Sequence, residues 1–282
     1  METQLYQFLG EALGLSASQV TIEYQGDGLT NKNYIVTHGL SQYAVRLGGA
    51  MSPVLGIRRE AEKAALDRVS AVGIGAEVLF FSPSTGNMVT RFIPGKKWAT
   101  QDLALAENRE RVAASLRVVH RLPAIGFEFS PYRDIERRVA FAREQGLNLP
   151  EKLPSLLERL ATIERARQGL PAEEWGLCHN DPFANNFLDD GSVRLLDWEY
   201  AGMGDVYFDL AAVSYSYTEE QRQRFLGSYF GDNNPGRLET LKQMLFVVRL
   251  WNALWGVVQT NTEDPKDKAL YQDMVDKMFA GF

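Results

Sequence analysis

The segment of this sequence that decides the fold is His179-Asn180-Asp181-Pro182-Phe183-Ala184-Asn185-Asn186, which has the form H-x-D-x-x-x-x-N. A second acid, Asp197, follows sixteen residues after Asp181, at the end of the run Val193–Leu196. H-x-D alone is a common pattern, but the later Asn and the second Asp make it specific. Mg²⁺ takes few ligands from proteins, because phosphate oxygens and water complete its octahedron of hard oxygen atoms. The segment therefore predicts a site for Mg²⁺ beside a phosphate-bearing ligand.

The spacing of these residues is typical of a kinase catalytic loop, in which the Asp accepts the substrate hydroxyl proton and the Asn binds a metal ion. Upstream, residues 26–33 join two predicted strands, and their glycines allow backbone N–H groups to approach anionic oxygens. Arg46 lies on the next predicted strand, where its guanidinium suits phosphate. Glu60 on the following helix is predicted to pair with Arg46. The alternative interpretation is a plain hairpin with a surface Arg and a surface Glu.

Two kinds of sequence meet near residue 93. Residues 1–93 contain short β-branched and aromatic runs around one helical segment, whereas residues 94–282 are mostly helical. The predicted strands are 20–25, 33–37, 43–47, 76–81 and 87–93. The predicted helices are 57–72, 103–121, 131–144, 153–168, 205–217, 219–229, 237–259 and 266–279. We therefore expect an α+β, bilobed fold, with a small antiparallel sheet lobe (1–93), a larger helical lobe (94–282) and a cleft between them.

Composition excludes several classes of protein. The 282 residues include 36 acids and 30 bases, and the net charge of −6 argues against a dedicated nucleic-acid binder. A single cysteine, Cys178, rules out internal disulfides and Cys-based zinc sites. The N-terminus lacks a basic region before an apolar one, and the most apolar stretch, 244–258, is too short and interrupted to span a bilayer. We expect a soluble, cytoplasmic protein without nucleic-acid or membrane partners.

The chain resembles the choline/ethanolamine kinase family, of the bacterial choline kinase type, within the aminoglycoside-phosphotransferase-like and protein-kinase-like fold. The segments that carry the resemblance lie between residues 26 and 211. They are GDGLTNKNYIV (26–36), YAVRLGG (43–49), TRFIPG (90–95), CHNDPFANNFL (178–188), and DWEYAG (197–202) followed by FDLA (208–211). The last pair is the most distinctive. The resemblance implies phosphorylation of an alcohol, with ATP and Mg²⁺ as cofactors.

The same resemblance assigns roles to individual residues. It implies that Asp181 is the catalytic base and that His179 braces the catalytic loop. Asn186 and Asp197 take the place of the magnesium ligands. Glu199 either reaches the metal or substrate or makes a structural hydrogen bond. The residues assigned to ATP are Gly26, Gly28, Thr30, Asn31, Arg46, Glu60 and, through their backbone at the interlobe hinge, Arg91 and Ile93.

The acceptor is expected to be a small cationic alcohol, because aromatic faces with nearby negative charge recognise quaternary ammonium groups. Trp251 and Trp255 lie four residues apart, hence on one face of a predicted helix, which resembles the late helix of the choline pocket. An ordinary buried aromatic stripe is the alternative. Further candidates for the aromatic cage are Tyr200, Tyr215 and Tyr217.

Two departures from the family pattern leave the acceptor open. Relatives often carry an acid shortly after FDLA, where this chain reads Tyr215-Ser216-Tyr217. The W-x-x-x-W spacing differs from the W-x-x-W of some relatives, which favours Trp255 over Trp251 as a pocket wall. Choline is the leading acceptor, and ethanolamine, thiamine or an aminoglycoside are alternatives. A nucleotide-binding pseudokinase is the non-enzymatic alternative, although it has no chemical need for Asp181, Asn186 and Asp197 together.

Overall fold

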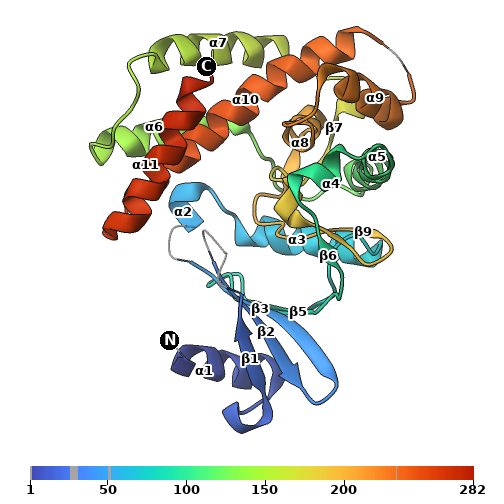
Figure 1. Ribbon diagram of the computed structural model, residues 1–282, viewed down its shortest axis with the longest axis vertical. Coiled ribbons are helices and arrows are strands. Elements are labelled where there is room, and N and C mark those ends of the chain that lie inside the picture. Colours follow the sequence, from blue (N-terminus) through green and yellow to red (C-terminus); the bar gives the residue numbers. More distant parts are fainter. Residues whose placement is uncertain (1, 26–30, 50–51, 233) are drawn as a thin grey trace.

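The computed structural model describes residues 2–25, 31–49, 52–232 and 234–282. An antiparallel sheet forms the N-terminal lobe, and helices form most of the C-terminal lobe, as expected for the α+β kinase-like fold. In Figure 1 the sheet lies at the bottom and the helical lobe above it, with α3 (Arg59–Ala71) between them. The proposed boundary at residue 93 stays a prediction.

The sheet of the N-terminal lobe has the strand order β1-β2-β3-β5-β4 with antiparallel pairing throughout. Because β1 and β2 are neighbours, the glycine-rich segment connects adjacent antiparallel strands, as the sequence predicts. Gly26, Gly28 and Thr30 themselves lie outside the described residues. The strand bounds are β1 Thr21–Tyr24, β2 Lys32–His38, β3 Ser41–Leu47, β4 Val78–Phe81 and β5 Met88–Arg91.

An N-terminal helix, α1 (Glu2–Leu13), covers the sheet and was not predicted. Leu5, Phe8 and Leu9 are buried, and their spacing places them on one helix face. They form a small core with strand residues that include Val45 and Val89. The N-terminal lobe therefore has its own hydrophobic core besides the one it shares with the C-terminal lobe.

Helix α3 packs towards the C-terminal lobe. Its buried face includes Ala65, Leu66 and Val69, which belong to the large hydrophobic core of the C-terminal lobe. Glu62 lies on the same face and is fully buried. One helix face therefore carries both the interlobe packing and a charged group.

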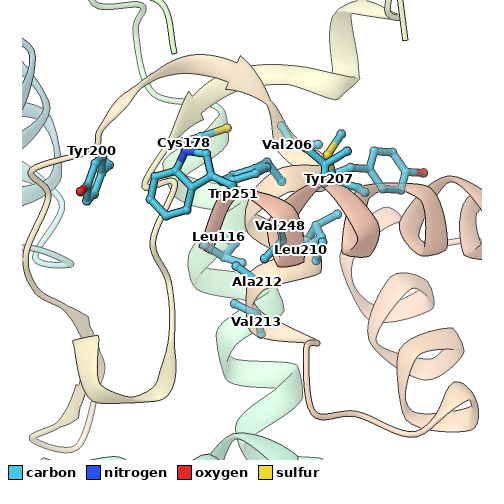
Figure 2. Close-up of a cluster of buried hydrophobic side chains, with 14 of the residues drawn as sticks. Leu116, Cys178, Tyr200, Val206, Tyr207, Leu210, Ala212, Val213, Val248 and Trp251 are labelled. Carbon is cyan, nitrogen blue, oxygen red and sulfur yellow. The ribbon is translucent and has the colours of Figure 1, made fainter. Parts of the chain in front are cut away.

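The C-terminal lobe is built around α10 (Gly236–Gln259), whose 24 residues pack against α6, α8 and α11. Figure 2 shows part of this core, where Trp251 and Val248 of α10 lie near Leu210 of α8. The predicted helix 103–121 is interrupted at Leu105, whose extended backbone separates α4 from α5. The other bounds are α2 Ser52–Leu55, α4 Thr100–Ala104, α5 Ala106–His120, α6 Pro131–Glu144, α7 Leu153–Ala166, α8 Val206–Val213, α9 Glu219–Phe230 and α11 Pro265–Ala280.

Short strands frame the H-x-D segment. Strand β7 (Trp175–Cys178) pairs with β10 (Gly202–Asp205), and the segment follows β7 directly. The remaining strands are β6 Lys96–Lys97, β8 Phe187–Asp189 and β9 Val193–Leu195, which form a separate sheet in the order β6-β8-β9. Asp197 follows β9 by two residues. Of the helices in the described ranges, none combines the length and hydropathy that crossing a bilayer requires.

Candidate active site

Asp181 is held by Asn186 at the end of the catalytic loop. The Asn186 Nδ2 group donates to the Asp181 Oδ2 atom at 3.1 Å and to the Asp181 backbone carbonyl at 2.8 Å. The Asn186 carbonyl in turn accepts from the Leu196 N–H at 2.8 Å, next to Asp197. The structure thus brings together the three residues that the sequence spacing singled out.

His179 makes the contacts expected of a loop brace. The imidazole is fully buried, its Nε2 atom lies 2.8 Å from the Leu196 carbonyl, and its Nδ1 atom accepts from the Asp181 N–H at 3.1 Å. Burial lowers the pKa of His179, so the ring is neutral, with the proton on Nε2. The side chain therefore holds the backbone of Asp181 and does not contact the Asp181 carboxylate.

The backbone of this loop is fixed by Asp209 of α8, which the sequence analysis did not single out. Its carboxylate accepts from the His179 N–H at 2.8 Å and from the Asn180 N–H at 2.7 Å, and it lies 3.0 Å from His120 Nε2. Asn180 has φ +67°, an uncommon conformation that such bonds stabilise. Asp209 thus fixes the position of the residue before Asp181.

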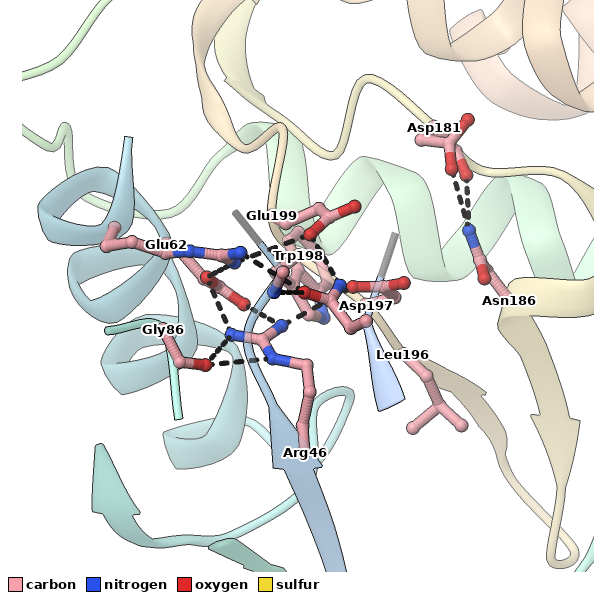
Figure 3. Close-up of polar contacts among 12 residues, drawn as sticks. Arg46, Glu62, Gly86, Asp181, Asn186, Leu196, Asp197, Trp198 and Glu199 are labelled. Atoms are coloured by element: carbon pink, nitrogen blue, oxygen red, sulfur yellow. Dashed lines mark hydrogen bonds and ion pairs between the residues drawn. The ribbon is translucent and has the colours of Figure 1, made fainter. Parts of the chain in front are cut away.

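Arg46 reaches the active site from β3 and pairs with Glu62. The Nη1 and Nη2 atoms donate to the two Glu62 oxygens at 2.5 and 2.9 Å, and Nη1 lies 3.6 Å from Asp197 Oδ1. Figure 3 shows the Arg46 guanidinium next to Glu62 and Asp197. Arg46 therefore lies between Glu62 and Asp197, and its predicted role towards the phosphates stays a prediction.

The prediction that Glu60 pairs with Arg46 is wrong. Glu60 is exposed, whereas Glu62 is fully buried. Two residues on an α-helix point about 200° apart, so only one of these acids can face Arg46. The signal was present in the sequence, because Glu62 shares its helix face with Ala65, Leu66 and Val69.

Glu199 joins the two lobes. Its Oε2 atom accepts from Asn31 Nδ2 at 2.8 Å and from Arg59 Nη1 at 3.3 Å. Asn31 Oδ1 also accepts from the Gly49 N–H at 3.2 Å. Asn31, which we assigned to ATP, therefore lies at the lobe junction beside Glu199, and the structural hydrogen bond predicted for Glu199 is present.

Burial and neighbouring negative charges raise the pKa values of Asp181 and Asp197. Burial raises the pKa of Asp181 well above its ordinary value, and the negative charges of Asp197 and Glu199 raise it further. Burial and the Glu199 charge also raise the pKa of Asp197, against the opposing effect of Arg46. Clustered carboxylates of this kind are typical of sites that bind cations or move protons.

The oxygen atoms at this position fit a Mg²⁺ ion. Asp197 Oδ1 is enclosed and accepts no hydrogen bond from the described part of the chain. The Asn186 amide directs its Nδ2 atom to Asp181, and its Oδ1 atom accepts from Asn185 Nδ2 at 3.3 Å, which leaves a second lone pair for a cation. Asp197 and Asn186 would therefore hold the ion, as the sequence predicts, through the hard oxygen ligands that Mg²⁺ prefers.

One backbone group of the predicted hinge already has a partner. The Arg91 N–H donates to the Glu77 carbonyl at 2.9 Å, and the predicted contact of the Arg91 backbone with adenine stays a prediction. The Arg91 side chain points to Glu77 as well, with 2.6 Å between Nε and Oε2. Within the described ranges the Ile93 N–H makes no hydrogen bond, and its role towards adenine stays a prediction.

Trp251 is part of the hydrophobic core, so its prediction as a pocket wall is wrong. Its side chain is 2% exposed. The Arg138 guanidinium carbon lies 3.9 Å from the centre of its ring, and Arg138 Nη1 donates to the Trp251 carbonyl at 2.7 Å. A guanidinium stacked on an indole occupies the face that a substrate cation would need. Arg138, which is fully buried, carried no recognisable signal in the sequence.

The other predicted cage residues divide into two groups. Tyr200 is 6% exposed, and its hydroxyl has no hydrogen-bond partner in the described part of the chain. Tyr215 is 37% exposed, and its ring lies against that of Phe183. Phe183 follows Asp181 by two residues in the sequence. Trp255 is partly buried and packs against Tyr271 of α11. These three stay candidates for acceptor contacts, whereas Tyr217 does not.

Tyr217 has a structural role instead of the predicted contact with the acceptor. It is 3% exposed, and its hydroxyl donates to the Leu103 carbonyl at 2.8 Å. We expect Tyr217→Phe to lower the free energy of unfolding by about 1 kcal/mol, the net contribution of one such bond, without changing the acceptor KM. Urea denaturation and initial-rate kinetics measure the two quantities, with the exposed Tyr215→Phe as a control for the denaturation measurement alone. If Tyr217→Phe raised the acceptor KM and left the free energy of unfolding unchanged, the predicted contact of Tyr217 with the acceptor would be supported instead.

The sequence matches the APH phosphotransferase enzyme family over residues 21–242. A LicA homologue of Metamycoplasma hominis is 30% identical over 153 residues, which cover 53% of this chain and 59% of that relative. A thiamine kinase of Escherichia coli is 41% identical over 68 residues, 24% of each chain. These matches thus span less than two-thirds of the relatives' lengths.

Solved structures are similar over the whole chain. A choline/ethanolamine kinase family protein of Mesorhizobium loti is 26% identical, with a TM-score of 0.77 over 99% of this chain and 92% of that one. The choline kinase LicA of Streptococcus pneumoniae, at 23% identity, has a TM-score of 0.81 over 100% and 99% of the two chains. Since the family match includes the catalytic segment and most of both lobes, the chain belongs to the phosphotransferase enzyme family and has the kinase-like fold.

Proposed function

We propose that this protein is an ATP-dependent kinase that phosphorylates the hydroxyl group of choline or a closely related amino alcohol. The observation that carries the proposal is the arrangement of Asp181, Asn186 and Asp197, with Arg46 approaching Asp197 from the sheet. Membership of the phosphotransferase family supports it. The products are the phosphomonoester and ADP.

In this proposal Asp181 orients the acceptor hydroxyl for in-line attack on the γ-phosphate and takes up its proton. The raised pKa of Asp181 suits that step, because a stronger base accepts the proton more readily. His179 and Asp209 keep the loop in position, and Arg46 offers positive charge towards the phosphates. Mg²⁺, when bound at Asn186 and Asp197, would neutralise the phosphate charge.

Thiamine is a second candidate acceptor. With Trp251 stacked against Arg138, fewer aromatic faces remain for a quaternary ammonium group than the sequence suggested. The local similarity to thiamine kinase points in the same direction. Tyr200, Tyr215 and Trp255 offer flat surfaces on which a larger aromatic cation would stack.

Release of ADP from Mg-ATP distinguishes these acceptors. We expect turnover with choline to exceed that with ethanolamine, thiamine and kanamycin, and to require added Mg²⁺. Faster turnover with thiamine would change the acceptor and keep the kinase assignment. Nucleotide binding without ADP release for any acceptor would contradict the proposal and support the pseudokinase alternative.

A further inference from the structure

Arg59, at the start of α3, is a buried cation at the junction of the two lobes. It is 6% exposed. Its Nη1 atom donates to Glu62 Oε2 at 2.7 Å and to Glu199 Oε2 at 3.3 Å, and its Nη2 atom donates to Asn31 Oδ1 at 3.3 Å. Arg59 therefore links the N-terminal lobe to the segment that follows Asp197.

Arg59 and Arg46 share the carboxylate of Glu62. Arg46 binds both Glu62 oxygens and lies next to Asp197. Arg59 binds one Glu62 oxygen and also donates to Glu199. Two parallel connections thus run from Glu62 to two acids on the same short segment. Figure 3 shows Arg46 beside Glu62 and Asp197, with Glu199 near Asp197.

The backbone at Gly86 leaves the space that the Arg59 side chain occupies. Gly86, with φ +73°, lies directly against the guanidinium, and a Cβ atom there would be 2.5 Å from Arg59 Nε. The Gly86 carbonyl also accepts from Arg46 Nε at 3.1 Å. Since a side chain at residue 86 would displace Arg59, the glycine leaves room for both arginines to reach Glu62.

We propose that Arg59 is a positioning residue for phosphoryl transfer, which holds Glu199 and the adjoining metal-binding Asp197 in register with Glu62 and the nucleotide-binding sheet. Arg59 acts through these acids and contacts no reacting atom. The inference rests on the proposed function only where turnover is measured. The affinity for Mg-ATP and the protection of backbone amides from hydrogen exchange test the effect of Arg59 on Glu199 and Asp197 without an acceptor.

Arg58 provides a matched control, because it is exposed, precedes Arg59 directly and makes no side-chain hydrogen bond within the described residues. We expect Arg59→Met to lower kcat by about 10- to 100-fold, the usual effect of removing a partner of a metal-binding carboxylate. The acceptor KM should change less. Arg59→Lys should recover part of the loss, since it keeps the charge without the forked geometry. Arg58→Met should match the wild type.

Hydrogen exchange separates positioning from mere stability. Arg59→Met should raise amide exchange in residues 197–201 while the core helix α10 stays protected. Unchanged kcat and exchange in Arg59→Met, or equal losses in Arg58→Met, would overturn the inference. So would a loss of stability with full kcat per folded molecule.

A second variant covers the case in which Arg59→Met does not fold. Glu199→Gln keeps the volume of the side chain and removes the charge that Arg59 faces. We expect the same rise in exchange at residues 197–201, and the Arg59→Lys/Glu199→Gln double variant should lose less than the two single losses combined. Additive losses would contradict the coupling between Arg59 and Glu199.

If the wild type releases no ADP with any acceptor, the proposed function fails, and amide exchange together with Mg-ATP affinity still decides the role of Arg59.

Discussion

Replacing Asp181 by Asn is expected to lower kcat by about 10²- to 10⁴-fold, the range that a general base contributes. The amide cannot take up the proton of the acceptor hydroxyl, yet it keeps the size of the carboxyl group. Since burial and the charges of Asp197 and Glu199 already raise the pKa of Asp181, a neutral side chain suits this position. We therefore expect the melting temperature of the variant to equal or exceed that of the wild type.

The measurements are ADP release under saturating Mg-ATP and acceptor, and thermal unfolding of the same preparations. Asp190→Asn is the control, because Asp190 is exposed, lies between β8 and β9 and pairs with Arg194 of β9. It should keep full kcat. An Asp181→Asn enzyme with more than about a tenth of the wild-type kcat would contradict the assignment of Asp181 as base.

Glu62→Gln is expected to cost about 3–5 kcal/mol of the free energy of unfolding, as breaking a buried ion pair usually does. Glu62 is fully buried and accepts from both Arg46 and Arg59, so the change leaves two buried guanidinium groups without their shared carboxylate. Such a loss is a large part of the 5–15 kcal/mol that stabilises a typical domain.

The matched control is Glu60→Gln, two residues earlier on the same helix. Glu60 is exposed, so the change should stay within about 0.5 kcal/mol. Urea denaturation of both variants measures the difference. Equal effects at the two positions would show that Glu62 does not carry the interlobe charge network, and a larger effect at Glu60 would restore the sequence-based pairing.

The acidic segment 179–210 shows what the local sequence can and cannot predict about the site. Residues 179–210 hold seven acids and one base, a local excess of negative charge that would suit a cation site. In the structure Asp189 and Asp190 pair with Arg111 and Arg194, and Asp209 holds the loop backbone. Three acids of the segment lie close together, because the charges of Asp197 and Glu199 raise the pKa of Asp181. Counting charges along the chain could not separate these groups, because Asp189 pairs with Arg111 and Asp209 binds the His179 backbone, both distant in the sequence.

The sequence by itself determined the features that depend on near neighbours in the chain. Asp181, Asn186 and Asp197 lie within sixteen residues, so their spacing alone placed them in one loop-and-strand unit. Local apolar periodicity predicted the division into a sheet lobe and a helical lobe, although it missed helix α1. The tertiary structure decided which acid faces Arg46, that Arg138 covers Trp251, and that Arg59 joins Glu62 to Glu199. These contacts depend on the rotation of each helix and on packing between lobes, which are settled only when the whole chain buries its apolar surface.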